Sequence, residues 1–195
     1  MSQTNKEKAL SDHLKEEDRS AIEEFIADMN LDEPVPVEEF RIVVRALLGA
    51  RGRFLYFVWK ILQEKGLDAD GLLKEICFRW GQFGGRKMAD VKTPTDFLKK
   101  ISAKAGTLAW EQEYTMLGDQ VASKEFNFCP HMAAMEDAGA SKEELAKLCK
   151  EMLCYGDYGI ADPHPVNLEW VGRTLAEGGK NCVMMITPKK QPGRG

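Results

Sequence analysis

The spacing of the apolar residues changes near residue 107, and this change constrains the fold more than any other feature of the sequence. Up to residue 101 the apolar side chains recur at the three- and four-residue spacing of helices. Residues 108–117 and 121–128 instead alternate apolar and polar side chains around Leu117-Gly118-Asp119. Alternation on either side of a turn predicts a β-hairpin.

A second hairpin is predicted from residues 167–175 and 182–187. Two helices are predicted between the hairpins, over residues 131–138 and 141–154, and Ser141 with Glu144 forms a capping box at the start of the second. The sequence therefore predicts an α+β fold, in which an N-terminal helical region packs on a four-stranded antiparallel sheet made of two hairpins with a helix pair between them.

The helical region contains one long segment, residues 40–62, whose apolar residues nearly surround the helix axis. Such a helix is typical of a buried central position. Gly49 and Gly52 within it indicate a kink or a close helix crossing. A further helix is predicted over residues 68–80, and the glycine-rich stretch that follows matches no phosphate-binding spacing, so we expect a loop there.

Three regions follow from this pattern. Residues 1–35 are expected to form a helical extension, residues 36–187 a single α+β domain, and residues 188–195 a disordered tail. The helix predicted over residues 5–29 has a thin apolar stripe, which predicts that it packs on the rest of the chain or on a second copy in a homodimer.

Composition narrows the partners and the compartment. The net charge of −4 gives no basic face of the kind that nucleic-acid binding requires. The N-terminus has no secretory apolar region, and no apolar run is long enough to cross a membrane, so a cytoplasmic location is expected. The five cysteines should then be reduced, and each is a buried hydrophobe, a metal ligand or a reactive thiol.

Residues 126–186 hold four of the five cysteines and two of the three histidines, which makes this segment the predicted site. Cys129 lies where a strand meets the N-terminus of a helix, and the exposed N–H groups there should favour its thiolate. His131, two residues on, is positioned to act as a base. A buried structural thiol is the alternative for Cys129.

Cys149 and Cys154 lie five residues apart on one predicted helix. They should therefore point about 140° apart and cannot both face one site. Cys154 is the better candidate, because Asp157 follows in a stretch with glycines on either side that we expect to be a loop. Asp157 is the predicted general base.

A metal site is a second interpretation of the same segment. Glu151 lies one helical turn before Cys154, and with Cys129 the two residues form a set suited to zinc or another divalent metal. His164 or Asp162 would complete the coordination. Arg173 is a candidate for binding a substrate carboxylate, with a salt bridge as its alternative.

These residues resemble the L-2-amino-thiazoline-4-carboxylic acid hydrolase family. The resemblance rests on an ordered pattern in the C-terminal third, which consists of Cys129-Pro130, Cys154-x-x-Asp157, Pro165, Leu168, Arg173–Gly178 and Cys182. It implies hydrolytic opening of a cyclic C–N bond at a site that contains cysteines, with or without a metal. His164 and Arg173 are the candidates for binding the substrate. More distantly, the pattern is similar to vinyl-reductase-type small-molecule-binding domains, some of which hold zinc through Cys and Glu-x-x-Cys.

Three functions remain open at this point. The chain could be a hydrolase acting on a small carboxylate-bearing heterocycle, with Cys129 as nucleophile or metal ligand, Asp157 as base and His131 or His164 as proton shuttle. It could be a non-catalytic module that binds a small molecule or zinc, or a scaffold with buried thiols. Convergence of Cys129, Cys154 and Asp157 on one pocket would favour the first two.

Overall fold

The computed structural model describes residues 34–189. The chain divides into two units, residues 1–37 and 38–195, and the second unit is the one described below. The helix predicted over residues 5–29 and residues 190–195 of the predicted tail lie outside the described residues. The tail was predicted to begin at residue 188, but Pro188 belongs to the last strand.

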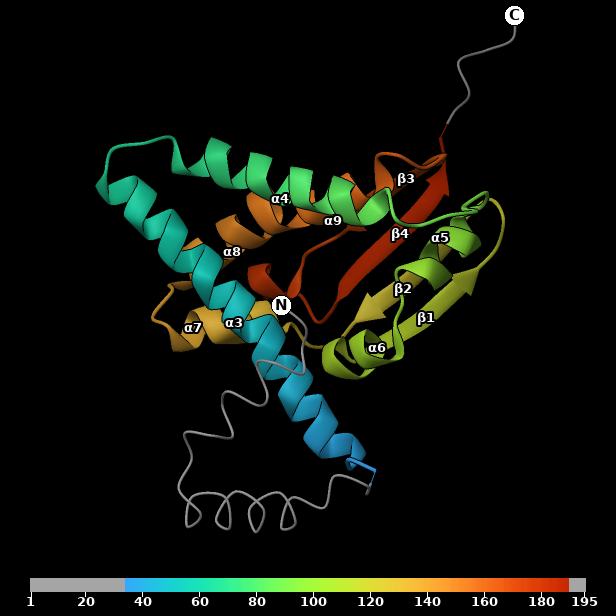
Figure 1. Cartoon of the computed structure of the whole chain (residues 1–195), viewed down its shortest axis with the longest axis horizontal. Coiled ribbons are helices and arrows are strands. Elements are labelled where there is room, and N and C mark those ends of the chain that lie inside the picture. The colour runs from blue at the N-terminus through green and yellow to red at the C-terminus, as the bar shows by residue number, and fades with distance from the viewer. Residues whose placement is uncertain (1–33, 190–195) are drawn as a thin grey trace, which may run out of the picture. The chain divides into compact units, whose positions relative to one another are not determined.

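Helices and strands follow one another as the change of period predicted (Figure 1). The elements before the second strand are α3 (Val37–Glu64), α4 (Ala69–Gly85), α5 (Pro94–Lys100), α6 (Lys104–Trp110), β1 (Gln112–Leu117) and β2 (Ala122–Phe126). The later elements are α7 (Pro130–Asp137), α8 (Lys142–Leu148), the π-helical turn η1 (Cys149–Leu153), α9 (Cys154–Ala161), β3 (Val166–Val171), the 3₁₀ turn η2 (Leu175–Glu177) and β4 (Cys182–Pro188).

The four strands form one antiparallel sheet in the order β1-β2-β4-β3. β1 and β2 form the first hairpin, β3 and β4 the second, and the hairpins join where Phe126 of β2 pairs with Cys182 of β4. The helices between the hairpins complete the predicted α+β architecture. The fold class is therefore confirmed.

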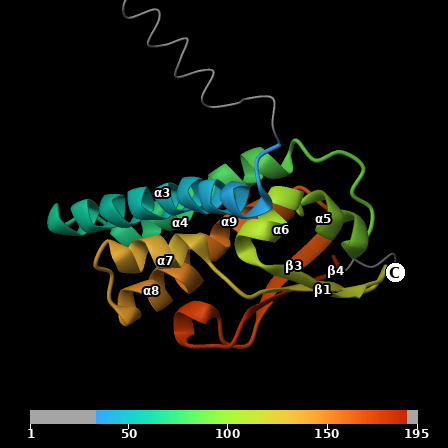
Figure 2. The ribbon, with the colours of Figure 1, turned by 90° about the horizontal axis from the view of Figure 1, so that it is seen from below.

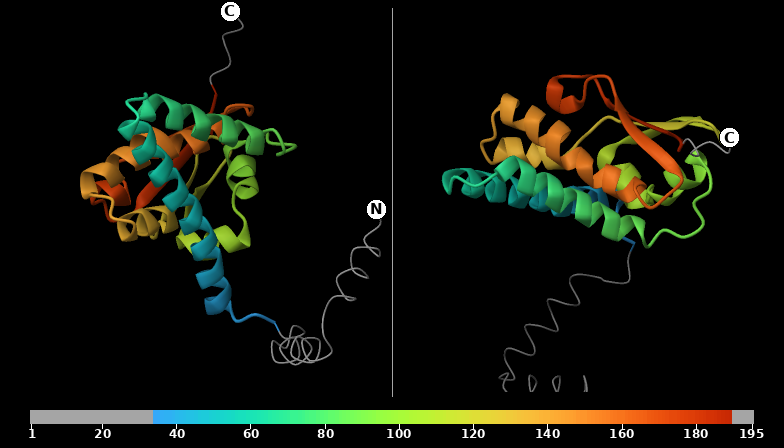
Figure 3. Two further views of the ribbon diagram at one scale, coloured as in Figure 1. Left: turned by 60° about the vertical axis from the view of Figure 1, so that its left-hand side comes forward. Right: turned by 90° about the horizontal axis from the view of Figure 1, so that it is seen from above.

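Helices cover one face of this sheet, as the views from below and above show (Figures 2 and 3). Burial alternates along β2 and β4, because successive side chains of a strand point to opposite faces. The buried side chains form two clusters. One lies among the helices and includes Leu73 and Met135, and the other lies on the sheet and includes Phe97 and Ile186.

The first hairpin begins later than predicted. Residues 108–110 belong to α6 rather than to a strand, and Glu111 ends that helix in the left-handed conformation at φ 51°. The predicted capping box of Ser141 and Glu144 is present at the start of α8, where Glu144 N donates to Ser141 Oγ at 3.2 Å.

The prediction that α3 is buried all round is wrong. One face is buried through Gly49, Gly52, Leu55, Tyr56 and Trp59. On the other face, Leu47 and Phe54 are 68% and 67% exposed within the described part of the chain. The predicted close crossing is present, because a Cβ on Gly52 would lie 2.8 Å from the backbone of His131 on α7.

Two stretches predicted as loops are helical, because their glycines serve close packing instead of turns. α4 continues through Gly85, and α9 spans the stretch around Asp157. A Cβ on Gly81 would lie 2.0 Å from the carbonyl oxygen of Gly156, and one on Gly159 would lie 2.1 Å from that of Phe78. α4 and α9 therefore pack backbone to backbone, and this crossing fixes the position of Asp157.

The helices of the described range do not include one with both the length and the apolar character needed to cross a membrane.

Candidate functional site

A cavity of about 140 Å³ lies between the helical cluster and the sheet. Its wall combines four thiols, three indole rings and a few ionisable groups. The lining residues are Arg51, Trp80, Trp110, Phe126, Cys129, His131, Cys149, Leu153, Cys154, Gly156, Asp157, Ile160, Trp170, Thr174 and Cys182. Cys129, Cys154 and Asp157 thus converge on one pocket, and His131 joins them.

Both Cys149 and Cys154 line this cavity, so the prediction that they must diverge is wrong. That prediction assumed an unbroken α-helix. Residues 149–153 instead form a π-helical turn, which needs more residues to complete each revolution. Residues five apart then lie on nearly the same face, and the two thiols are close enough for each to shift the pKa of the other. Such turns are rare, and they are frequently found at functional sites.

The thiols of the cavity differ in their readiness to ionise. The Cys154 thiol lowers the pKa of Cys149 below its ordinary value, although burial acts in the opposite direction. The pKa of Cys154 is raised by its thiol partner and by burial. Cys149 is therefore the thiol best suited to act as a nucleophile.

The prediction of a lowered thiol pKa for Cys129 is wrong. Burial raises the pKa of Cys129 to about 12, although the backbone N–H groups of Met132 and His131 act in the opposite direction. The helix N-terminus is present, since Cys129 is the N-cap of α7, but removal from water outweighs it. Burial likewise raises the pKa of Cys182 to about 11.

Asp157 is the carboxyl group of the cavity. Burial raises its pKa to about 6, while Lys124 and Arg51 lower it. Arg51 is itself partly buried and its guanidinium stacks over the Trp80 ring, 3.3 Å from the ring centroid. Lys124 lies behind the wall, where burial lowers its pKa to about 8 and its Nζ donates to Gln112 Oε1 at 3.1 Å. One carboxyl group and two cations give this region a net positive charge when all three are ionised.

Two nitrogen atoms at the cavity have no hydrogen-bond partner among the described residues. These atoms are His131 Nε2 and Trp170 Nε1, and both are buried. Burial, followed by the charge of Arg51, lowers the pKa of His131 to about 3, so the imidazole is neutral at pH 7. Buried polar atoms are normally paired, so these two favour a bound molecule that offers acceptor atoms, given a suitable histidine tautomer.

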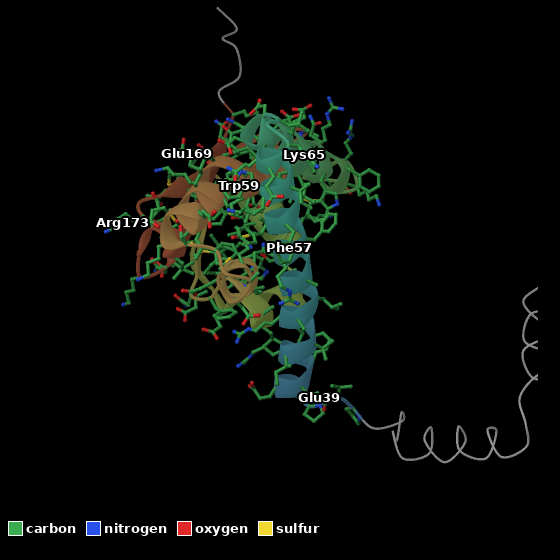
Figure 4. All side chains as sticks on the ribbon, turned by 90° about the vertical axis from the view of Figure 1, so that its left-hand side faces the viewer. Glu39, Phe57, Trp59, Lys65, Glu169 and Arg173 are labelled. Atoms are coloured by element: carbon green, nitrogen blue, oxygen red, sulfur yellow. The ribbon has the colours of Figure 1, made fainter. Side chains whose placement is uncertain are left out.

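The turn after β3 closes the cavity with Thr174 instead of Arg173. Thr174 Oγ1 donates to Glu177 Oε2 at 3.0 Å and accepts from the Cys149 thiol at 3.9 Å. Arg173 is exposed, donates to the carbonyl oxygen of Glu177, and lies at the edge of the unit (Figure 4). Arg173 therefore holds the turn, while Arg51 is the cation of the cavity.

His164 and Glu151 also lie outside the cavity. His164 is buried against Phe97, and its Nε2 lies 3.0 Å from the carbonyl oxygen of Gly85. Glu151 is exposed on the outer side of the π turn, so the extra residue turns it away from Cys154. Across residues 34–189 no three His, Cys, Asp or Glu side chains lie close enough to hold a metal ion. The predicted set of Cys129, Glu151 and Cys154 is thus not brought together.

Sequence reasoning missed Arg51, Cys149 and Thr174. Arg51 carried no signal of its own in the sequence, because the same helix also carries Arg41, Arg45, Arg53 and Lys60. Cys149 could not have been found without the π turn, for which the sequence offers no marker. Thr174 lies within the segment that carried the family resemblance, next to the residue that was chosen.

The chain matches no protein-family model and no curated protein sequence.

Proposed function

We propose that this protein is a hydrolase that opens a small carboxylate-bearing heterocycle at a cyclic C–N bond, of the 2-amino-thiazoline-4-carboxylate type. The observation that carries the proposal is that one cavity gathers a thiol of lowered pKa, Cys149, a carboxyl group, Asp157, and a cation, Arg51. The family resemblance of the C-terminal third supports the same reaction class. The volume of about 140 Å³ suits a single small ring.

Binding would rest on charge and on stacking. Arg51 would pair with the substrate carboxylate, because a guanidinium offers two parallel donors to the two carboxylate oxygens. The ring would lie against Trp110, Phe126 and Trp170, whose flat faces suit a flat heterocycle. His131 Nε2 and Trp170 Nε1 would donate to its acceptor atoms.

The chemistry would proceed in two halves. Asp157, ionised above pH 6, takes the proton of Cys149, and the thiolate attacks the ring carbon between the two heteroatoms. The ring C–N bond breaks and Asp157 returns that proton to the released nitrogen. Asp157 then takes a proton from water, whose oxygen attacks the same carbon and expels the Cys149 thiolate, which recovers the proton. One water molecule is consumed and the thiol is regenerated.

The direct test is to incubate the purified protein with 2-amino-thiazoline-4-carboxylate and follow ring opening by NMR. Cys149→Ser and Asp157→Asn should each reduce kcat by at least about 100-fold, since each removes a reacting group. Cys77→Ala is the matched thiol control, because Cys77 is buried in the helical cluster and does not line the cavity.

Arg51→Lys should raise KM more than it lowers kcat, because a lysine cannot make the bidentate pair. Arg53→Lys, on the same helix and outside the cavity wall, is its control. Absence of turnover in the wild type, with or without a divalent metal, would refute the proposal.

A non-catalytic binding module is the second function that an observation favours. Most of the thiols have raised pKa values, and the two unpaired donors of His131 and Trp170 suit a ligand held without reaction. Calorimetric binding of the thiazoline acid that depends on Arg51, together with no ring opening, would select this function.

A further inference from the structure

The outer face of α3 carries a stripe of apolar side chains at regular spacing. The positions advance alternately by three and four residues, which is the spacing of a coiled-coil seam. The members of this stripe, called the α3 seam below, are Phe40, Val43, Leu47, Ala50, Phe54, Phe57 and Ile61. All seven are exposed in the described part of the chain.

The α3 seam lies opposite the face by which the helix packs on its own unit. The buried face contains Gly52, Tyr56 and Trp59, roughly half a turn of the axis away at about 100° per residue. Figure 4 shows Trp59 on the side of α3 toward the rest of the unit, with Phe57 away from it. The helix therefore has two apolar faces, and its own unit uses only one of them.

The seam is large enough to matter. Exposed fractions run from 40% at Phe40 to 68% at Leu47 among its six large side chains. Given the areas that such side chains present, this corresponds to roughly 500–600 Å² of apolar surface on each copy. A stable interface buries roughly 600–1,000 Å² on each partner, so the seam and its borders together reach the lower end of that range.

We propose that the α3 seam pairs antiparallel with the α3 seam of a second copy, which makes the protein a homodimer built on a two-helix coiled coil. A coiled-coil seam is complementary to another seam of the same spacing. With a two-fold axis near Ala50, the side chains of each seam would insert between the side chains of the other, and the two copies would use the same residues.

Charge at the border of the seam sets the direction. Three charged residues lie along one border of the seam, because they are separated by multiples of seven residues: Glu39, Arg53 and Lys60. Antiparallel pairing places this border against the same border of the partner in reverse order, so Glu39 faces the partner's Lys60. Within one copy, Lys60 Nζ also pairs with Glu144 Oε1 at 2.9 Å. Parallel pairing would place Lys60 against the partner's Lys65, and it would also align the two helix dipoles.

The test is the mass of the full chain in solution by light scattering. We expect twice the chain mass of 21.9 kDa for the wild type at tens of micromolar, and the single mass for Leu47→Glu with an unchanged circular dichroism spectrum. Ile42→Glu is the control, since Ile42 is 66% exposed but lies off the seam, and it should remain dimeric.

Direction is tested by cross-linking. Phe40→Cys and Ile61→Cys proteins, mixed and treated with a short thiol cross-linker, should join to each other far more than either joins to itself. A monomeric wild type would overturn the proposal. The seam would then have another occupant, either residues 1–33 of the same chain or a lipid surface, which binding to lipid vesicles would identify. A dimer that survives Leu47→Glu would overturn it as well.

Discussion

Gly159 offers the sharpest test of how the fold positions the site. Replacing it with alanine adds one methyl group at the crossing of α4 and α9. That Cβ would lie 2.1 Å from the carbonyl oxygen of Phe78 and 3.0 Å from the backbone nitrogen of Gln82. Both are backbone atoms, so no side chain can turn aside, and the two helices must separate by roughly 1 Å to reach ordinary contact distances.

The free energy of unfolding should fall as a result. Overpacking of this kind costs about 1–3 kcal/mol, and more where the obstructing atoms are backbone. Alanine recovers up to about 1 kcal/mol, because glycine is the poorer helix former. The net expectation is a loss of about 2 kcal/mol, which lowers Tm by roughly 4–8 °C in a chain of this size.

Urea unfolding monitored by circular dichroism measures this loss. Gly84→Ala is the matched control on α4, because a Cβ there meets nothing within 4 Å, and stability should rise by a few tenths to 1 kcal/mol. Gly159→Ala should also reduce ring opening by at least about 10-fold, since Asp157 lies two residues away on the displaced helix. If Gly159→Ala unfolds at the wild-type urea midpoint, the backbone-to-backbone packing of α4 and α9 is refuted.

Three further outcomes are expected. Iodoacetamide should alkylate Cys149 before Cys77, whose pKa burial raises to about 11, as peptide mass spectrometry at several reaction times would detect. Asp157→Asn should be more stable than the wild type at pH 7 by up to about 3 kcal/mol, because the raised pKa of about 6 penalises folding above pH 6; urea titrations should show the difference vanishing below about pH 4. In the folded protein the pKa of Lys124 is about 8, against an ordinary 10.5. Between pH 8 and 10.5 the free energy of unfolding of the wild type should therefore rise by up to about 3 kcal/mol relative to that of Lys124→Met. If the free energy of unfolding changes equally with pH in the two proteins, the burial of the Lys124 charge is contradicted.

The sequence was sufficient for the architecture because the two periods, helical and alternating, are local properties that burial enforces. The same local rules misplaced the glycines. Gly81, Gly156 and Gly159 were interpreted as loop residues, yet they lie inside helices where two backbones approach each other. A glycine that permits a turn and a glycine that permits contact are identical in sequence, so only the packing distinguishes them.

The candidate site was predicted in part for a related reason. Cys129, Cys154, Asp157 and His131 were found because their residue types are rare and were clustered in the chain. Arg51 lies more than seventy residues before that cluster and enters the cavity only through the crossing of α3 with α7. The ranking of the thiols was also inaccessible, since it depends on burial and on the contact between Cys149 and Cys154.

The π turn at residues 149–153 also affects how this chain should be aligned with others. One extra residue in a helix changes the angular position of everything beyond it by about 100° without changing the course of the axis. A homologue that lacks this residue would keep both helical segments but present a different side chain to the cavity. Alignments across this segment should therefore allow a gap of one residue between Leu148 and Cys154, because an ungapped alignment would equate residues that point about 100° apart around the helix axis.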